Sequence, residues 1–358
     1  MIQTVKDWFN RHFSDPQAII LVFTLVILLA VILVMGDMLA PVLASVVIAY
    51  LLEGMVRRLE SWGVMRIISV VIVFLLFIMF VVLVVFLLLP QLYNQTKDLI
   101  TELPAMLGQA QTALLTLPAK YPEFFTVEQI KEMTNGLRDD MAAIGKSVLT
   151  WSLSSVVGAI TLLVYLILVP LLVFFFMKDK HQLIKWLTSY LPDNRTLLAL
   201  VWSDVDRQIG NYVRGKFIEI LIIWTVCLLT FVWLDLNYAM LLAVLVGLSV
   251  IIPYIGASVV TIPVAAVAYF QWGLTADFYW VVVAYLIIQA LDGNALVPLL
   301  FSEVVNLHPI AIIVAILVFG GLWGFWGVFF AIPLATVVQA VLKAWPDKSK
   351  TVPEISNA

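Results

Sequence analysis

Charged residues are scarce in this sequence of 358 residues: Asp, Glu, Lys and Arg together make up 12% of it, whereas a soluble protein carries about 25%. Apolar residues make up 63% and fall in long blocks, at 17–35, 38–56, 67–90, 151–177, 217–234, 238–270, 278–301 and 309–342. A helix needs about 20 apolar residues to cross about 30 Å of hydrocarbon. Each block reaches or approaches that length, which predicts a multi-span membrane protein.

Cysteine and histidine are almost absent. The one cysteine, Cys227, lies inside an apolar block, so an intramolecular disulfide is excluded and the thiol is expected to pack as a small hydrophobe. Three histidines, at positions 12, 181 and 308, are too few and too scattered to form a metal site by themselves. Walker loops, HExxH, GxGD and serine-elbow patterns are missing too. We therefore expect no metal, no cofactor and no enzymatic activity, and nothing in the net charge of −3 points to nucleic acid.

Lysine and arginine orient the predicted spans by the positive-inside rule. Basic residues precede the first span, separate the second from the third and follow the last, and seven more lie between the fourth and the fifth. The short loops at 36–37 and 235–237 carry none. Eight spans with both termini in the cytoplasm fit this distribution. The amphipathic stretch 1–16 has no small-residue cleavage site, so we interpret it as a retained lead-in helix.

The expected fold class is an all-α integral membrane protein with about eight transmembrane helices, some of them broken, and an extramembrane helical hairpin. Its predicted parts are a lead-in helix with spans 1–3 (1–90), an extracytoplasmic helical stalk (91–150), span 4 (151–177), a cytoplasmic amphipathic segment (178–213), spans 5–8 with a broken-helix pathway (214–345) and a cytoplasmic tail (346–358).

Three polar stretches have helical periodicity. Apolar residues in 91–117 recur mostly three, four or seven positions apart, and those from Ile130 to Val148 recur at steps of 3, 4, 4, 3 and 4. We expect spans 3 and 4 to extend as a paired stalk, which either packs on itself or contacts another copy. In 194–213 the apolar residues form one stripe, which predicts a helix along the inner leaflet, as an anchor or as part of a gate.

Helix breakers interrupt the block at 238–270. Pro253, Gly256 and Pro263 fall within eleven residues, and an internal proline removes a backbone donor and clashes with the preceding turn. A straight helix of 33 residues would also overshoot the hydrocarbon by about 20 Å. Both observations predict a broken helix.

The last block repeats this theme. Gly324 and Gly327 belong to a run of glycines at a spacing that permits close approach of helices. Pro333 follows in an IPLA motif that resembles the IPVA motif at 262–265. The pair hints at two related half-elements that meet at a site near the membrane midplane.

A polar triplet, Asp292-Gly293-Asn294, interrupts the apolar block at 278–301, and Pro298 follows the triplet. Asp at the centre of a transmembrane helix costs about 2.5 to 3.5 kcal/mol, so its side chain should face protein or water. Unwound backbone at this depth is tolerated only where it lines a cavity. We interpret Asp292 as a titratable or cation-binding group on a solute or cation pathway, with Asn294 as its neutral partner. The alternative is that the span ends at Leu291 and the triplet caps it at the interface.

Five further residues are candidates at the two ends of this pathway. Glu303 and His308 would line its outer mouth if the preceding segment dips into the membrane, and His308 would then titrate near neutral pH; otherwise they belong to an interfacial loop. Arg214, Lys216 and Glu219 open the fifth span at the cytoplasmic edge, either as a topology signal or as substrate contacts.

Five motifs are specific in combination: YVRGK (212–216), IIPYIGASVVTIP (251–263), ALDGNALVPLLF (290–301), NLHP (306–309) and GGLWGFWGVFFAIPLA (320–335). With them the sequence resembles, over nearly its whole length, the autoinducer-2 exporter family of transporters, and within it the PerM-like permeases. The resemblance implies a secondary transporter of the bacterial inner membrane that forms a homo-oligomer, with a pentamer as one option. Some relatives are described as exporters of the furanone autoinducer-2, and others as sodium(lithium)/proton antiporters.

Three functions therefore stay open. The first is an exporter of a small solute, autoinducer-2-like in kind, driven by an ion gradient. The second is a sodium(lithium)/proton antiporter, which the extra acid in Ser302-Glu303 favours because the family pattern has a glycine-type residue there. The third is an oligomeric channel or membrane scaffold without coupled transport. The expected partners are the lipid bilayer, a small solute or cation, and further copies of the chain.

Overall fold

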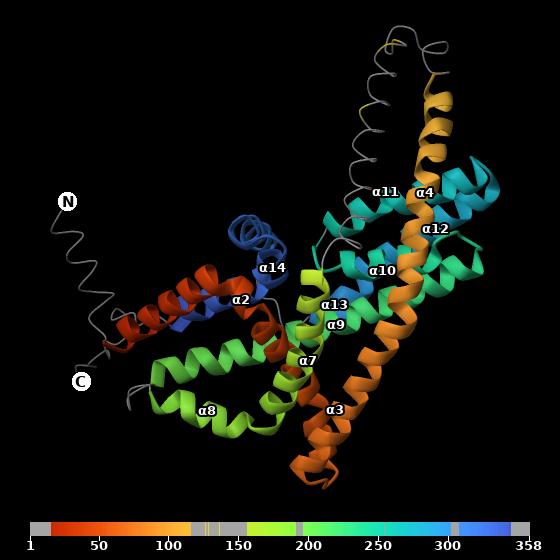
Figure 1. Cartoon of the computed structure of the whole chain (residues 1–358). Helices are drawn as coiled ribbons and strands as arrows, with labels where there is room; N and C mark the ends of the chain where they lie inside the picture. Colours follow the sequence, from red (N-terminus) through yellow and green to blue (C-terminus); the bar gives the residue numbers. More distant parts are fainter. Residues whose placement is uncertain are drawn as a thin grey trace, which may run out of the picture. The chain divides into compact units, whose positions relative to one another are not determined.

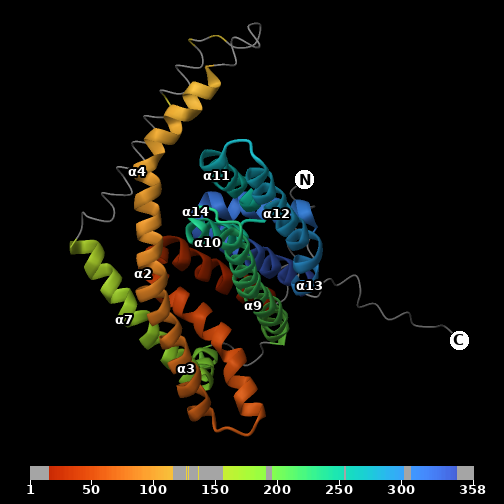
Figure 2. The same ribbon diagram turned by 90° about the vertical axis from the view of Figure 1, so that its right-hand side faces the viewer.

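Figures 1 and 2 show the computed structural model of the chain. The structure describes residues 16–115, 156–190, 196–253, 255–301 and 308–344, together with Thr126, Glu128 and Gly136. Every regular element in these residues is a helix. The chain divides into two compact units: unit 1 comprises 1–74, 168–217 and 299–358, and unit 2 comprises 75–167 and 218–298.

Unit 1 contains the long helix α2 and the bent C-terminal helix α14. Its elements are α2 (Pro16–Ser61), the start of α3 (Arg66–Leu83), the end of α7 (Val156–Lys178), α8 (Lys180–Ser189), the first part of α9 (Thr196–Trp233), the end of α13 (Val297–Phe301) and α14 (Pro309–Ala344). Two apolar clusters join α9 to α14: Val201 and Val205 pack with Ala340, and Tyr212 and Val213 pack with Ile332.

Unit 2 contains the largest apolar core. Its elements are the rest of α3, the π-helical turn η1 (Val84–Leu88), α4 (Leu89–Leu114), the second part of α9, α10 (Ala239–Ser249), α11 (Ile255–Trp272), α12 (Ala276–Leu291) and the π-helical turn η2 (Asp292–Leu296). Buried residues of α9, α10, α11 and α12 meet in one cluster, in which Cys227 is fully buried. The thiol is thus a small core hydrophobe, as predicted.

Five helical stretches of the described residues are long and apolar enough to cross a membrane: Met38–Ser61, Arg66–Thr112, Val201–Trp233, Ile255–Trp272 and Ala276–Phe301. Four shorter apolar helices are Val164–Lys178, Ala239–Ser249, Ile310–Gly324 and Ala331–Val341. The fold is therefore that of an all-α, multi-pass membrane protein, as predicted. The count of eight spans stays a prediction.

The predicted break in the block at 238–270 is confirmed. Helix α10 ends at Ser249 and α11 begins at Ile255, with Pro253 in the turn between them. Gly256 makes this turn possible, because an added Cβ would overlap the Ser249 carbonyl group. Pro263, in contrast, lies inside α11 without ending it, so only one of the two prolines breaks the helix.

The last block is broken too. Helix α14 changes direction at Gly324, whose φ of 58° and ψ of −135° are non-helical, in a region of positive φ that favours glycine (Figure 1). Gly327 follows the bend, and a Cβ there would overlap the Phe319 carbonyl group. Pro333 lies within the second half of α14, where the Thr336 hydroxyl donates to its carbonyl oxygen at 2.7 Å.

Helix α9 differs from the prediction. We expected an interfacial helix over 194–213 and a separate fifth span, but one helix of 38 residues runs from Thr196 to Trp233. Within the apolar stripe that suggested a lipid-facing helix, Val201 and Val205 are buried against Ala340 of α14 instead, while Trp202 is exposed. A stripe that packs on protein has the same composition as one that packs on lipid, so the pattern alone did not distinguish them.

Helix α4, the first half of the predicted stalk, contacts the start of α10. The Leu241 N–H donates to the Gln95 side chain at 2.8 Å, and Leu99 packs against the core of unit 2. Burial, with a hydrogen bond to Glu102, raises the pKa of Tyr238, which keeps this phenol protonated. Apart from Thr126, Glu128 and Gly136, the second half of the stalk lies outside the described residues.

Candidate transport site

Asp292 lies in a helix that continues without a gap from Ala276 to Phe301, through α12, η2 and α13. The polar triplet forms a π-helical turn, in which the Val297 N–H donates to the Asp292 carbonyl oxygen. The predicted backbone is wrong in both alternatives: the chain does not unwind, and the helix does not end at Leu291. The role of Asp292 on a pathway stays a prediction. Pro298 lacks the N–H that an α-helix needs at that position, and the wider turn directly precedes it.

The Asp292 carboxylate faces the core of unit 2 and is 9% exposed. It follows Val281, Tyr285 and Ile288, all buried, at steps of 4, 3 and 4, so the four residues share one face of the helix. Asn294 is exposed, and its amide donates to the Ala290 carbonyl oxygen at 2.8 Å. The expectation that Asn294 pairs with Asp292 is therefore wrong, because the two side chains point to different sides of the helix.

Polar groups of α9, α11 and α12 accompany Asp292 in this core. The Tyr285 hydroxyl donates to the Ala257 carbonyl oxygen at 2.9 Å, and the Thr261 hydroxyl lies 3.2 Å from the Tyr285 oxygen. Cys227 lies within electrostatic reach of Asp292. Sequence reasoning missed Tyr285 and Thr261, although the separation of seven residues between Tyr285 and Asp292 is the signal that would have found the first.

Glu219 is a second buried carboxylate of unit 2. It lies on α9 and is 1% exposed. Ile223 and Cys227 follow it at steps of four residues, so Glu219 continues the buried face of this helix. The sequence suggested a residue at the edge of the membrane, whereas the structure encloses Glu219 in protein.

The other candidates on α9 lie in unit 1. Lys216 is buried, with its ammonium group 5.4 Å from the centre of the Phe301 ring. The same ring lies 5.8 Å from Tyr212 and covers Gly215, where an added Cβ would crowd it. Arg214 donates to the Asn211 side chain at 2.9 Å.

The remaining predicted pathway residues are divided between the two units. Pro253, Gly256 and Pro263 lie with Asp292 in unit 2, where Pro298 is exposed. In unit 1, Gly324, Gly327 and Pro333 form and follow the bend of α14, and His308 precedes that helix. His308 is exposed, and its Nδ1 accepts the Ile310 N–H at 3.3 Å. Glu303 lies outside the described residues.

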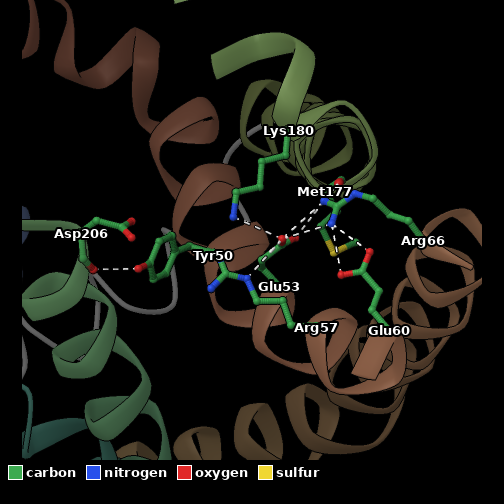
Figure 3. A network of polar contacts seen from close by, with 8 residues as sticks. All are labelled: Tyr50, Glu53, Arg57, Glu60, Arg66, Met177, Lys180 and Asp206. Atoms are coloured by element: carbon green, nitrogen blue, oxygen red, sulfur yellow. Dashed lines mark hydrogen bonds and ion pairs between the residues drawn. The ribbon is translucent and has the colours of Figure 1, made fainter. Parts of the chain in front are cut away.

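A charged cluster in unit 1 was not predicted. The Glu53 carboxylate lies between Lys180, with a nitrogen–oxygen distance of 3.2 Å, and Arg66, also at 3.2 Å (Figure 3). Arg57 is 3.7 Å away, and Arg66 also pairs with Glu60 at 3.2 Å. The cluster joins α2 to α3 and α8. No local spacing predicts it, because Lys180 is 127 positions from Glu53.

Comparison with known proteins shows the family of this chain. A model of AI-2E family transporters matches residues 1–347. The chain belongs to the AI-2E transporter family. PerM of Escherichia coli (strain K12), which is named as a permease, is 48% identical over 347 residues, or 97% of this chain and 98% of PerM. YueF of Bacillus subtilis (strain 168), named as a transport protein, is 28% identical over 84% of this chain and 82% of its own.

A third relative carries a substrate in its name. TqsA of Escherichia coli (strain K12), named as an AI-2 transport protein, is 24% identical over 328 residues, or 91% of this chain and 92% of TqsA. The family resemblance drawn from the motifs is thus confirmed. As a member of the AI-2E family, the chain belongs with proteins that are named as permeases or transport proteins. Its own long apolar helices are those of a multi-pass membrane protein.

Proposed function

We propose that this AI-2E family protein is a secondary transporter of the bacterial inner membrane, which exports a small solute and is driven by an ion gradient. The observation that carries the proposal is Asp292, a carboxylate enclosed in the apolar core of unit 2 on a π-helical turn. The name of TqsA supports an autoinducer-2-like solute. Both termini lie in the cytoplasm in this proposal, and the protein works as a homo-oligomer.

The physical argument rests on the cost of burying charge. An ionised Asp inside a transmembrane helix costs about 2.5 to 3.5 kcal/mol, which binding of a proton or a metal cation at the carboxylate removes. The charged and neutralised states of Asp292 therefore favour different degrees of water access. The turn at Pro253 divides the apolar block at 238–270 of the same unit into two shorter helices, α10 and α11, which can tilt separately when the occupancy of the carboxylate changes.

The test uses proteoliposomes with a pH-sensitive dye inside and a preset proton gradient. Labelled furanone efflux and the response to Na+, Li+ and K+ are measured for wild type and Asp292→Asn. Asp277→Asn is the matched control, because Asp277 is an exposed acid in the first turn of the same helix. We expect gradient-driven flux in wild type and in Asp277→Asn, and its loss in Asp292→Asn. Equal flux in all three proteins would remove Asp292 from the mechanism.

The second candidate is sodium(lithium)/proton antiport. Glu219 favours antiport, because together with Asp292 it gives unit 2 two buried carboxylates. Exchange of a cation for protons needs groups that can bind the cation and the proton. Antiport predicts a dye response to Na+ or Li+ without any organic solute, lost in Glu219→Gln or Asp292→Asn. A dye that stays silent while furanone leaves the vesicles contradicts antiport and supports the exporter. If a correctly inserted protein gives neither a dye response nor furanone efflux, the result would indicate a channel or scaffold instead.

A further inference from the structure

Beyond its first residue, Lys180, which lies within the angular range of the apolar side chains, helix α8 separates apolar and polar side chains around its axis. At 100° per residue, its apolar side chains occupy an arc of roughly 160°, formed by Leu183, Ile184, Trp186, Leu187 and the following Tyr190. The opposite side holds only polar side chains, namely His181, Gln182, Lys185, Thr188 and Ser189. Such a division is typical of a helix at a boundary between water and an apolar phase.

Most of the apolar face of α8 is left open by the part of the chain that the structure describes, and only Leu183 in it is half-buried. Ile184, Trp186, Leu187 and Tyr190 are between 45% and 73% exposed. The Trp186 and Tyr190 rings contact each other edge to face, with their centres 5.4 Å apart. Four large apolar side chains on the eleven residues from Lys180 to Tyr190 would be costly to leave in water.

We propose that α8 lies in the interfacial plane of the inner leaflet, with this face in contact with lipid acyl chains. Helix α7 leads directly to that plane, since Asp179 alone separates its apolar end from α8. Ile167, Leu171 and Phe175 of α7 are exposed apolar residues, as expected where lipid surrounds a helix. Trp and Tyr are the residues that gather at the membrane–water interface, and Lys185 on the opposite side would extend to the headgroups.

The contacts at the start of α8 support this orientation. The Arg66 guanidinium donates to the Met177 carbonyl oxygen at 2.8 Å, at the end of α7. Lys180, the first residue of α8, pairs with Glu53 at 3.2 Å. These two bonds hold the chain on both sides of Asp179, where α8 leaves α7 at a large angle (Figures 1 and 3). Protein contacts therefore turn α8 away from the direction of α7, and lipid covers the face that protein leaves open.

Site-directed spin labelling tests this orientation in the full-length protein. Leu187→Cys places a nitroxide on the apolar face, and Lys185→Cys, two residues away and also exposed, is the matched control. Both cysteine substitutions are introduced into the Cys227→Ala variant. They are then repeated in the wild-type background, where the buried Cys227 thiol is shielded from the spin-label reagent. Collision with oxygen, which concentrates in lipid, and with a water-soluble nickel chelate is measured in proteoliposomes by power saturation.

We expect the label at 187 to collide with oxygen several-fold more than with the nickel chelate, and the label at 185 to show the reverse. Equal access of the chelate to both positions would overturn the proposal, because α8 would then lie in water. A label at 187 that is shielded from both reagents would also overturn it, by showing that a second copy or another protein covers the face. The result does not depend on transport, so it stands apart from the function proposed above.

Discussion

Gly256 stands in the first turn of α11, close to the carbonyl group of Ser249 at the end of α10. The two helices can meet at this turn only because position 256 has no Cβ. The obstacle is backbone, which cannot rotate away as a long side chain can. At Gly293 the situation is different: its site in η2 has open space around the position of an added Cβ.

Gly256→Ala should therefore destabilise the protein by about 1 to 3 kcal/mol, as overpacking does in closely packed interiors. Gly293→Ala should leave the stability unchanged or raise it slightly, because alanine costs less entropy than glycine in a helix. Thermal unfolding in detergent measures both. A large loss in Gly293→Ala would mean that the polar triplet does need an unwound backbone, as the sequence first suggested.

Asp292 and Asn294 are two residues apart but have different environments, since the first is buried and the second is exposed. The sequence predicted that the Asp292 side chain faces protein or water, since the cost of charge in lipid holds at any position in the span, and the structure buries this side chain. The orientation of Asn294 depends on the π-helical turn, which rotates the residues after it relative to an α-helix. No spacing rule for an α-helix contains that turn.

At the scale of elements, the Glu53 cluster ties α2 to α3 and α8. The contributions of its cations should differ, because Arg57 is 63% exposed and Lys180 and Arg66 are mostly buried. An exposed ion pair contributes close to nothing. A partly buried one leaves a charge without its partner when it is broken.

Glu53→Gln should lower the free energy of unfolding by about 1.5 to 3 kcal/mol, the range for hydrogen bonds to charged groups. Lys180→Met should have a smaller effect and Arg57→Gln none that can be measured. Denaturant unfolding in mild detergent gives this order. If Arg57→Gln were as damaging as Glu53→Gln, the cluster would act through long-range charge and not through the contacts seen in Figure 3.

At the scale of the whole molecule, the charge distribution assigns sides of the membrane. The lysines at 178, 180 and 185 belong to the basic segment between the fourth and fifth predicted spans, and the positive-inside rule places that segment in the cytoplasm. The same rule predicts that the segment 91–150, which includes most of α4, is extracytoplasmic. Each position can be tested independently of how the two units are arranged.

Gln109→Cys on α4 and Ser189→Cys on α8 are both exposed positions. In right-side-out membrane vesicles, an impermeant maleimide should label Gln109→Cys at once and Ser189→Cys only after the membrane is opened. Wild type should stay unlabelled in both conditions, because Cys227 is buried. Labelling in the reverse order would contradict the predicted orientation and would place α8 outside the cell.

The sequence by itself determined the class of protein and the main interruptions of its helices. Long apolar blocks require a membrane whatever their packing, and proline at 253 acts through its own backbone geometry. The position of the bend in α14, at Gly324, came from the structure. Tertiary structure alone decided that α9 is continuous, that Glu219 is enclosed, and that Glu53 and Lys180 meet. Apolar side chains are equally suited to lipid and to protein, and ion pairs between distant parts of the chain depend on how the helices pack. Whether an apolar stripe contacts lipid or protein therefore depends on how the helices pack, and the sequence of the stripe alone does not decide it.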